Sequence, residues 1–110
     1  MDTERLGRMT RRQRVQAEAG CTVETRARRF LAGVDRARHA FAFLTSMADV
    51  NRTEAYRVLF ACGYSVRQIQ AAAGVSSPNS VWTPCRGATA RNPNPQLVQL
   101  VRDMGMANRT

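Results

Sequence analysis

The chain has 110 residues and a formal net charge of +9, from 17 basic and 8 acidic residues, and every basic residue is arginine. This length suits one domain with a small core, and the charge favours a polyanionic partner such as nucleic acid. A membrane-spanning protein is excluded, since the longest apolar stretch (residues 40–44) is too short to cross a bilayer. The first residues are charged and no apolar segment follows them, so we expect no secretory signal and a cytoplasmic protein.

The absence of lysine has two explanations. The planar guanidinium of arginine pairs well with phosphate and with guanine edges, which is compatible with nucleic-acid binding. A GC-rich genome would produce the same preference for arginine codons. Only the net charge therefore argues for a polyanionic partner.

The first predicted element is a long helix preceded by a basic segment. Residues 1–20 have a thin apolar face, so we expect a flexible arm or a frayed helix there. A helix is predicted over residues 22–46, with Thr22 as its N-cap. Its apolar residues follow the a/d spacing of three heptads: Val23, Ala27, Phe30, Val34, Ala37, Phe41 and Leu44. This stripe needs an apolar partner, either the rest of the domain or the same helix of a second chain, and the small size favours a homodimer.

Two short helices are predicted next, over residues 52–62 and 66–73. Asn51 begins the first with a capping-box-like pattern, and Ser65 begins the second with an S-x-x-Q capping box. Gly63 ends the first helix, since glycine readily adopts the left-handed conformation of the residue after a helix.

A further helix is predicted to be cut short by Pro84. Ser76 or Ser77 caps this helix, and Pro78 suits its first position. Proline lacks an amide hydrogen and disfavours helical dihedrals in the residue before it, so we expect the helix to end at residue 82 or 83.

The last predicted elements are a basic loop over residues 84–94 and a helix over residues 95–104, capped by Asn94. No strand pattern is present. The predicted fold class is therefore all-α: residues 21–110 form a single small helical domain with a long N-terminal helix and a helix-turn-helix unit.

The helix-turn-helix is predicted over residues 65–83. Gly74 supplies the sharp turn, and the apolar inner positions on either side of it are Ile69, Ala73, Val75 and Val81. The run AAAGVSSPNSV resembles the A-x-x-x-G-V-S-x-x-x-V signature of helix-turn-helix regulators of bacteria, phages and plasmids. The resemblance covers about twenty residues and implies a DNA-binding transcriptional regulator. Two departures are Gln70, where the pattern usually has alanine, and one extra residue after Val75.

Charge distribution supports the same region as a DNA-binding surface. No Asp or Glu lies between Glu54 and Asp103, whereas five arginines lie there. A long segment without acids presents positive charge to a polyanion without interruption.

The DNA-contact candidates follow from how such units dock. Recognition helices read base edges with their N-terminal residues, and nearby arginines hold the backbone. The candidates are Ser76, Ser77, Asn79, Ser80, Arg57, Arg67, Arg86 and Arg91. Asn79 is expected to pair with adenine, while each single arginine, taken alone, fits a solvated surface charge better than a DNA contact. Trp82 has a large apolar area, so we expect a core position for it in preference to stacking on a base.

Other functional classes have less support. The three cysteines are widely spaced and His39 is the only histidine, so no metal site or other cofactor is expected, and no nucleophile–base arrangement indicates an enzyme. The preferred hypothesis is a sequence-specific regulator of the repressor or autoregulator type that binds double-stranded DNA as a homodimer. The alternatives are a small phage- or plasmid-type factor that binds a host protein, and a basic protein that binds nucleic acid without sequence preference.

Overall fold

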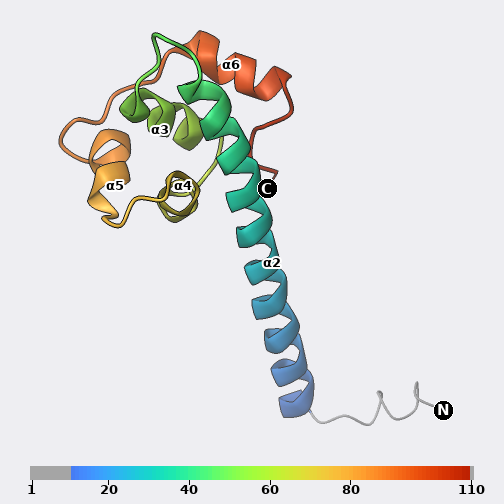
Figure 1. Cartoon of the computed structure of the whole chain (residues 1–110). Coiled ribbons are helices and arrows are strands. Elements are labelled where there is room, and N and C mark those ends of the chain that lie inside the picture. The colour runs from blue at the N-terminus through green and yellow to red at the C-terminus, as the bar shows by residue number, and fades with distance from the viewer. Residues whose placement is uncertain (1–10, 110) are drawn as a thin grey trace.

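The structure, a computed structural model, describes the backbone of residues 11–109 and the side chains of residues 23–109. The described part contains helices and no strand, which confirms the all-α prediction. None of its helices combines the length and the apolar character needed to cross a membrane. The helices are α2 (Arg11–Thr45), α3 (Arg52–Ala61), α4 (Val66–Ala73), α5 (Asn79–Arg86) and α6 (Pro95–Asp103) (Figure 1).

Helix α2 begins much earlier than predicted. It runs without interruption from Arg11 to Thr45, so Thr22 lies inside the helix and is not its N-cap. The segment before Thr22 consists largely of Arg, Gln, Ala and Glu, which are strong helix formers, and an established helix extends more easily than a new one nucleates. The part of the predicted arm before residue 11 lies outside the described residues.

The apolar stripe of α2 is divided between two environments. Its C-terminal half is in the core, where Val34, Ala37 and Leu44 are buried against the other helices. Its N-terminal half projects away from them (Figure 1), and the side chain of Val23 remains 65% exposed. The C-terminal half of the stripe therefore packs within this chain, whereas its N-terminal half is left exposed.

The predicted caps of the shorter helices are largely present. Asn51 accepts a hydrogen bond from the Glu54 amide at the start of α3, and Ser65 and Gln68 form a complete capping box at the start of α4. Glu54 does not return a bond to Asn51, so only half of the first box forms. These signals lie within four residues of each helix end, and they predict the bounds of α3, α4 and α6 to within one residue.

The core forms where α2, α3 and α4 meet. Leu59 of α3 and Ile69 of α4 are fully buried, and Tyr64 joins them from the segment between these helices. The Tyr64 hydroxyl donates to the Met106 carbonyl at 2.6 Å, which holds the chain after α6 against the core. The C-terminal tail consequently runs beside α2 (Figure 1).

Helix α5 does not end before Pro84. It continues to Arg86. Its N-cap is Pro78, which has helical dihedrals, and the predicted cap by a serine side chain is absent. Pro84 lacks only the bond to the carbonyl of residue 80, which belongs to an exposed residue. Burial of the proline ring, together with a hydrogen bond from Arg57 to its carbonyl, offsets that loss. The predicted loop is correspondingly shorter.

Candidate nucleic-acid interface

Helix α5 has one face in the core and one in solvent. Val81 and Pro84 are buried, whereas Asn79, Trp82 and Arg86 are exposed. These three residues occupy positions i, i+3 and i+7, which share one side of a helix, and Ser80 is exposed beside them. No residue of α5 is acidic. The helix therefore offers an amide, an indole and a guanidinium to solvent on one face without a carboxylate.

The turn between α4 and α5 extends from Gly74 to Pro78. Gly74 has φ 70°, the left-handed conformation that glycine tolerates best. The side-chain amide of Gln70 donates to the carbonyl of Ser76 at 3.3 Å. Gln70 and the extra residue after Val75 are the two departures from the regulator signature. The hydrogen bond connects them, because Gln70 holds the lengthened turn. Ser76 and Ser77 are exposed at the start of α5.

Arg57 is not a surface residue, and the prediction that it contacts DNA is wrong. Its side chain is only 6% exposed. Nε donates to the Pro84 carbonyl at 3.1 Å, and Nη2 donates to the Thr89 carbonyl at 3.1 Å. Nη1 lies 3.8 Å from a carboxylate oxygen of Glu54, which balances the buried charge. A guanidinium enclosed in this way has no free edge for a phosphate.

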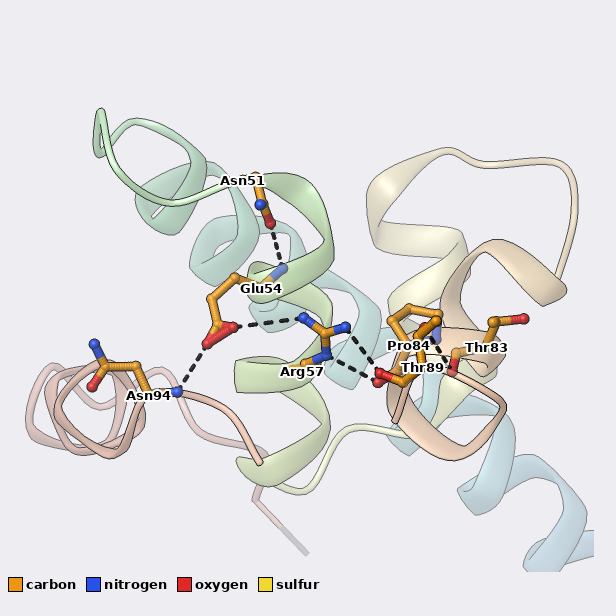
Figure 2. A network of polar contacts seen from close by, with 7 residues as sticks. All are labelled: Asn51, Glu54, Arg57, Thr83, Pro84, Thr89 and Asn94. Carbon is orange, nitrogen blue, oxygen red and sulfur yellow. Dashed lines mark hydrogen bonds and ion pairs between the residues drawn. The ribbon is translucent and has the colours of Figure 1, made fainter. Parts of the chain in front are cut away.

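The contacts of Arg57 belong to a larger network that connects α3 with α5 and with the following loop (Figure 2). Glu54 accepts a hydrogen bond from the Asn94 amide at 2.8 Å, at the start of α6. The Thr89 hydroxyl donates to the Thr83 carbonyl at 3.3 Å, which folds the loop back onto α5. Helix α3 thereby determines where α5 and the loop lie. The i, i+3 spacing of Glu54 and Arg57 was the available sequence signal for this ion pair.

The remaining predicted arginines are exposed, and two of them, Arg86 and Arg91, border Phe60. Arg67 lies on α4 beside a cavity of about 480 Å³ that also contacts Gly74. Arg86 lies at the C-terminal end of α5, with its guanidinium 6.0 Å from the centre of the Phe60 ring. The loop after α5 leads to α6 (Figure 1). Arg91 belongs to this loop and lines a cavity with Phe60 and Cys85.

The surroundings of Arg91 make it the weakest of the predicted DNA contacts. Together with Asp49 and Glu54, Arg91 lines a cavity of about 260 Å³. These two carboxyl groups lower the local positive potential. The four polar residues at the start of α5, by contrast, are all exposed along one short segment: Ser76, Ser77, Asn79 and Ser80.

Trp82 is on the surface, so the prediction of a core position is wrong. Its side chain is 48% exposed, and its indole lies against the backbone of Gly87. A side chain at Gly87 would come within 2.6 Å of the ring, so glycine is needed there for the indole to pack. The inward phase of Val81 and Pro84 places Trp82 on the opposite side of the helix. A helix that ended before Pro84 would not have had Pro84 as a second inward residue, so the sequence did not indicate that Trp82 faces outward.

Among the described side chains, the thiols of Cys62 and Cys85 are both free. Burial raises the pKa of Cys85 to about 11, against a smaller opposing effect of Arg57. Burial also raises the pKa of Cys62, and the positive charge of Arg102 opposes that rise. Both thiols are therefore protonated near neutral pH and are poor nucleophiles.

The raised pKa of Cys85 predicts an alkaline loss of stability. The ordinary thiol pKa is 9.0, so between pH 9 and about 11 the unfolded chain loses a proton that the folded chain retains. The stability that the protonated Cys85 thiol contributes is fully present below the pKa of the unfolded chain. It is lost as the pH rises through the pKa of the folded chain. Urea midpoints should fall over this range, and Cys85→Ala should lessen the fall without changing the shape of the curve below pH 8. If the urea midpoints of the wild-type protein and of Cys85→Ala fell equally steeply with pH above pH 9, the loss of stability would not come from Cys85.

Comparisons with protein families, curated proteins and solved structures found no match to this chain.

Proposed function

We propose that this protein binds double-stranded DNA through α4 and α5 and acts as a sequence-specific transcriptional regulator, as a repressor or autoregulator. The observation that carries the proposal is the solvent-facing side of α5, where Asn79, Trp82 and Arg86 are exposed on a helix without acids. An α-helix with its side chains is about 10–12 Å in diameter, and the major groove is about 12 Å wide, so a helix such as α5 can enter the groove.

Each polar residue at the start of α5 has a defined role in this proposal. Asn79 pairs with the N6 and N7 edge of adenine through its side-chain amide. The hydroxyl groups of Ser76, Ser77 and Ser80 bond base edges or phosphates. Trp82 lies one turn further along and supplies an apolar surface for a thymine methyl group.

The backbone contacts come from arginines outside the first turn of α5. Arg67 on α4 is exposed and takes part in no ion pair among the described residues, so its charge is available to a phosphate. Arg86 holds a second phosphate at the other end of α5. Arg57 contributes indirectly, because its hydrogen bonds hold the end of α5 in place.

A homodimer is part of the proposal, with a smaller interface than the stripe over residues 22–46 suggested. The core already covers the part of α2 after residue 33, so the interface is left with the projecting half. Val23 and Leu31 are 65% and 66% exposed there. Two copies joined in this way bind an inverted repeat if their α5 helices lie about one DNA turn apart.

The same projecting half supports one second candidate function, the binding of a different protein. An exposed apolar stripe on a helix fits the groove of a partner as well as a second copy of the chain. A protein-interaction factor would bind DNA weakly and without sequence preference. DNA specificity therefore separates the two functions.

A titration that follows Trp82 tests the proposal directly. Trp82 is the only tryptophan of the chain and lies on α5, so its fluorescence reports contact with DNA. The probes are duplexes selected by the protein from a random pool and the duplex upstream of its own gene, each competed with random duplex at physiological salt. Selected duplex should bind at least about a thousandfold more tightly than random duplex. Equal competition by both would reject sequence-specific regulation.

A pair of substitutions tests the separate roles of base and backbone contacts. Asn79→Ala should reduce discrimination at one base pair by about 1–3 kcal/mol and leave the salt dependence unchanged. Arg67→Ala should weaken binding to all duplexes alike and lower the slope of log K against log salt by about one. If Asn79→Ala also weakened all sequences equally, α5 would not be reading bases.

A further inference from the structure

A basic pocket lies on α2, apart from the exposed face of α5. It has a volume of about 580 Å³ and lies between α2, the start of α4 and the C-terminal tail. We call it the tail pocket, and its polar lining consists of Arg26, Arg29, Ser65, Gln68, Asn108 and Arg109. Residues from three separate segments of the chain thus meet at one place.

Among the residues that the structure describes, no carboxylate compensates the charges around the tail pocket. Three guanidinium groups line it and no carboxylate does. In the described part of the chain, the ion pairs are those of Arg28 with Glu24, Arg38 with Asp35 and Arg57 with Glu54. All three lining arginines are exposed and belong to none of these pairs. Their positive charges therefore add in a single concave site.

Neighbouring groups strengthen the positive potential there. Arg36 lies about two helical turns beyond Arg29 on the same face of α2, and it bonds the side-chain oxygen of Asn108 at 3.3 Å. Among the described residues its Nε has no hydrogen-bond partner. The α4 end that starts at Ser65 carries the partial positive charge of a helix N-terminus.

Specific contacts hold the three segments together. The backbone amide of Asn108 donates to the Cys62 carbonyl at 3.0 Å, and the side-chain amide of Asn108 donates to the Gly63 carbonyl at 2.9 Å. A side chain on Gly33 would overlap the Gln68 amide and lie 3.5 Å from Asn108. Glycine at this position of α2 thus allows both α4 and the tail to approach. The tail pocket is a product of packing and not a chance meeting of long side chains.

We propose that the tail pocket binds a phosphate group, and that this phosphate belongs to the backbone of DNA flanking the sequence that α5 reads. Guanidinium groups match the oxygens of phosphate in geometry and charge, and three arginines line this pocket. The assignment of the phosphate to DNA rests on the proposed function, whereas the phosphate chemistry of the pocket does not.

Two matched triple variants test the proposal. The first removes the pocket charges: Arg26→Gln, Arg29→Gln and Arg109→Gln. The second removes three exposed arginines outside the pocket and serves as the control: Arg28→Gln, Arg38→Gln and Arg102→Gln. Circular dichroism establishes that both are folded. Loss of one phosphate contact should lower the slope of log K against log salt by about 0.9, which weakens duplex binding about tenfold at 0.1 M salt. The control should retain the wild-type slope.

Inorganic phosphate distinguishes the two sources of the ligand. It is titrated at constant ionic strength, while NMR follows the arginine Nε–H signals. Saturable shifts that disappear only in the pocket variant, with an unchanged duplex slope, would assign the pocket to a free phosphate compound and overturn the DNA assignment. A reduced slope supports the DNA phosphate with or without these shifts. No shift and an unchanged slope would overturn the proposal entirely. If wild-type protein prefers no duplex sequence, the proposed function fails and the phosphate titration alone decides the pocket.

Discussion

Replacement of Arg57 by alanine is expected to lower the free energy of unfolding by about 3–5 kcal/mol. The substitution leaves the carbonyls of Pro84 and Thr89 without their donor and leaves the Glu54 carboxylate without its nearby positive charge. Each unsatisfied buried polar group costs about 1–3 kcal/mol, and more when the group is charged. Such a loss is a large fraction of the stability of a small domain. Urea unfolding followed by circular dichroism measures it.

Arg67→Ala is the matched control, because it removes the same side chain from an exposed site. Its effect on stability should stay within about 0.5 kcal/mol. The two substitutions also distinguish a structural arginine from a DNA contact. A phosphate contact by Arg57 would lower the salt slope of DNA binding and leave stability unchanged, and that result would contradict the buried network.

Leu44→Ala is the second substitution with a large expected effect. Leu44 is fully buried at the C-terminal end of the α2 stripe, so its truncation should cost about 3–5 kcal/mol through lost burial and a residual cavity. Urea unfolding at low protein concentration measures this cost in the monomer. A change below 1 kcal/mol would mean that this half of α2 does not pack within the chain.

Val23→Ala shortens an apolar side chain of the same stripe at its exposed end. In the monomer it should change stability by less than about 0.5 kcal/mol. If the projecting half of α2 forms the proposed dimer, the same substitution should weaken dimerisation in sedimentation equilibrium. Leu31→Asp is the stronger variant, since it places a charge on the apolar surface. A dimer that is insensitive to both substitutions would have its interface elsewhere.

Local signals account for most of the correct sequence predictions. The bounds of α4 follow from the capping box of Ser65 and from Gly74, which forms the predicted sharp turn in a left-handed conformation. The start of α6 follows from Asn94 and Pro95 in the same way. In each case the responsible groups lie within four residues of one another, so no knowledge of the fold is required.

The same kind of local reasoning failed where distant contacts outweigh it. Pro84 would end an isolated helix, but Arg57, which is 27 positions away in the sequence, bonds its carbonyl and lies against the end of α5. Trp82 was predicted to be buried because of its size, yet the continuation of α5 turns it outward. The exposure of the candidate residues at the start of α5 was predictable, because turns and first helical turns usually lie at the surface.

The sequence by itself determined that this protein is helical, where most of its helices begin and end, and that it carries a large excess of arginine. Those properties depend on propensities, on caps and on composition, which act over a few residues or over the whole chain. Only the tertiary structure decided which arginine is buried, which half of the α2 stripe is covered and which basic residues meet in the tail pocket. These outcomes depend on contacts between segments far apart in the sequence, such as Gly33 with Gln68 and Asn108, and burial is decided by such contacts.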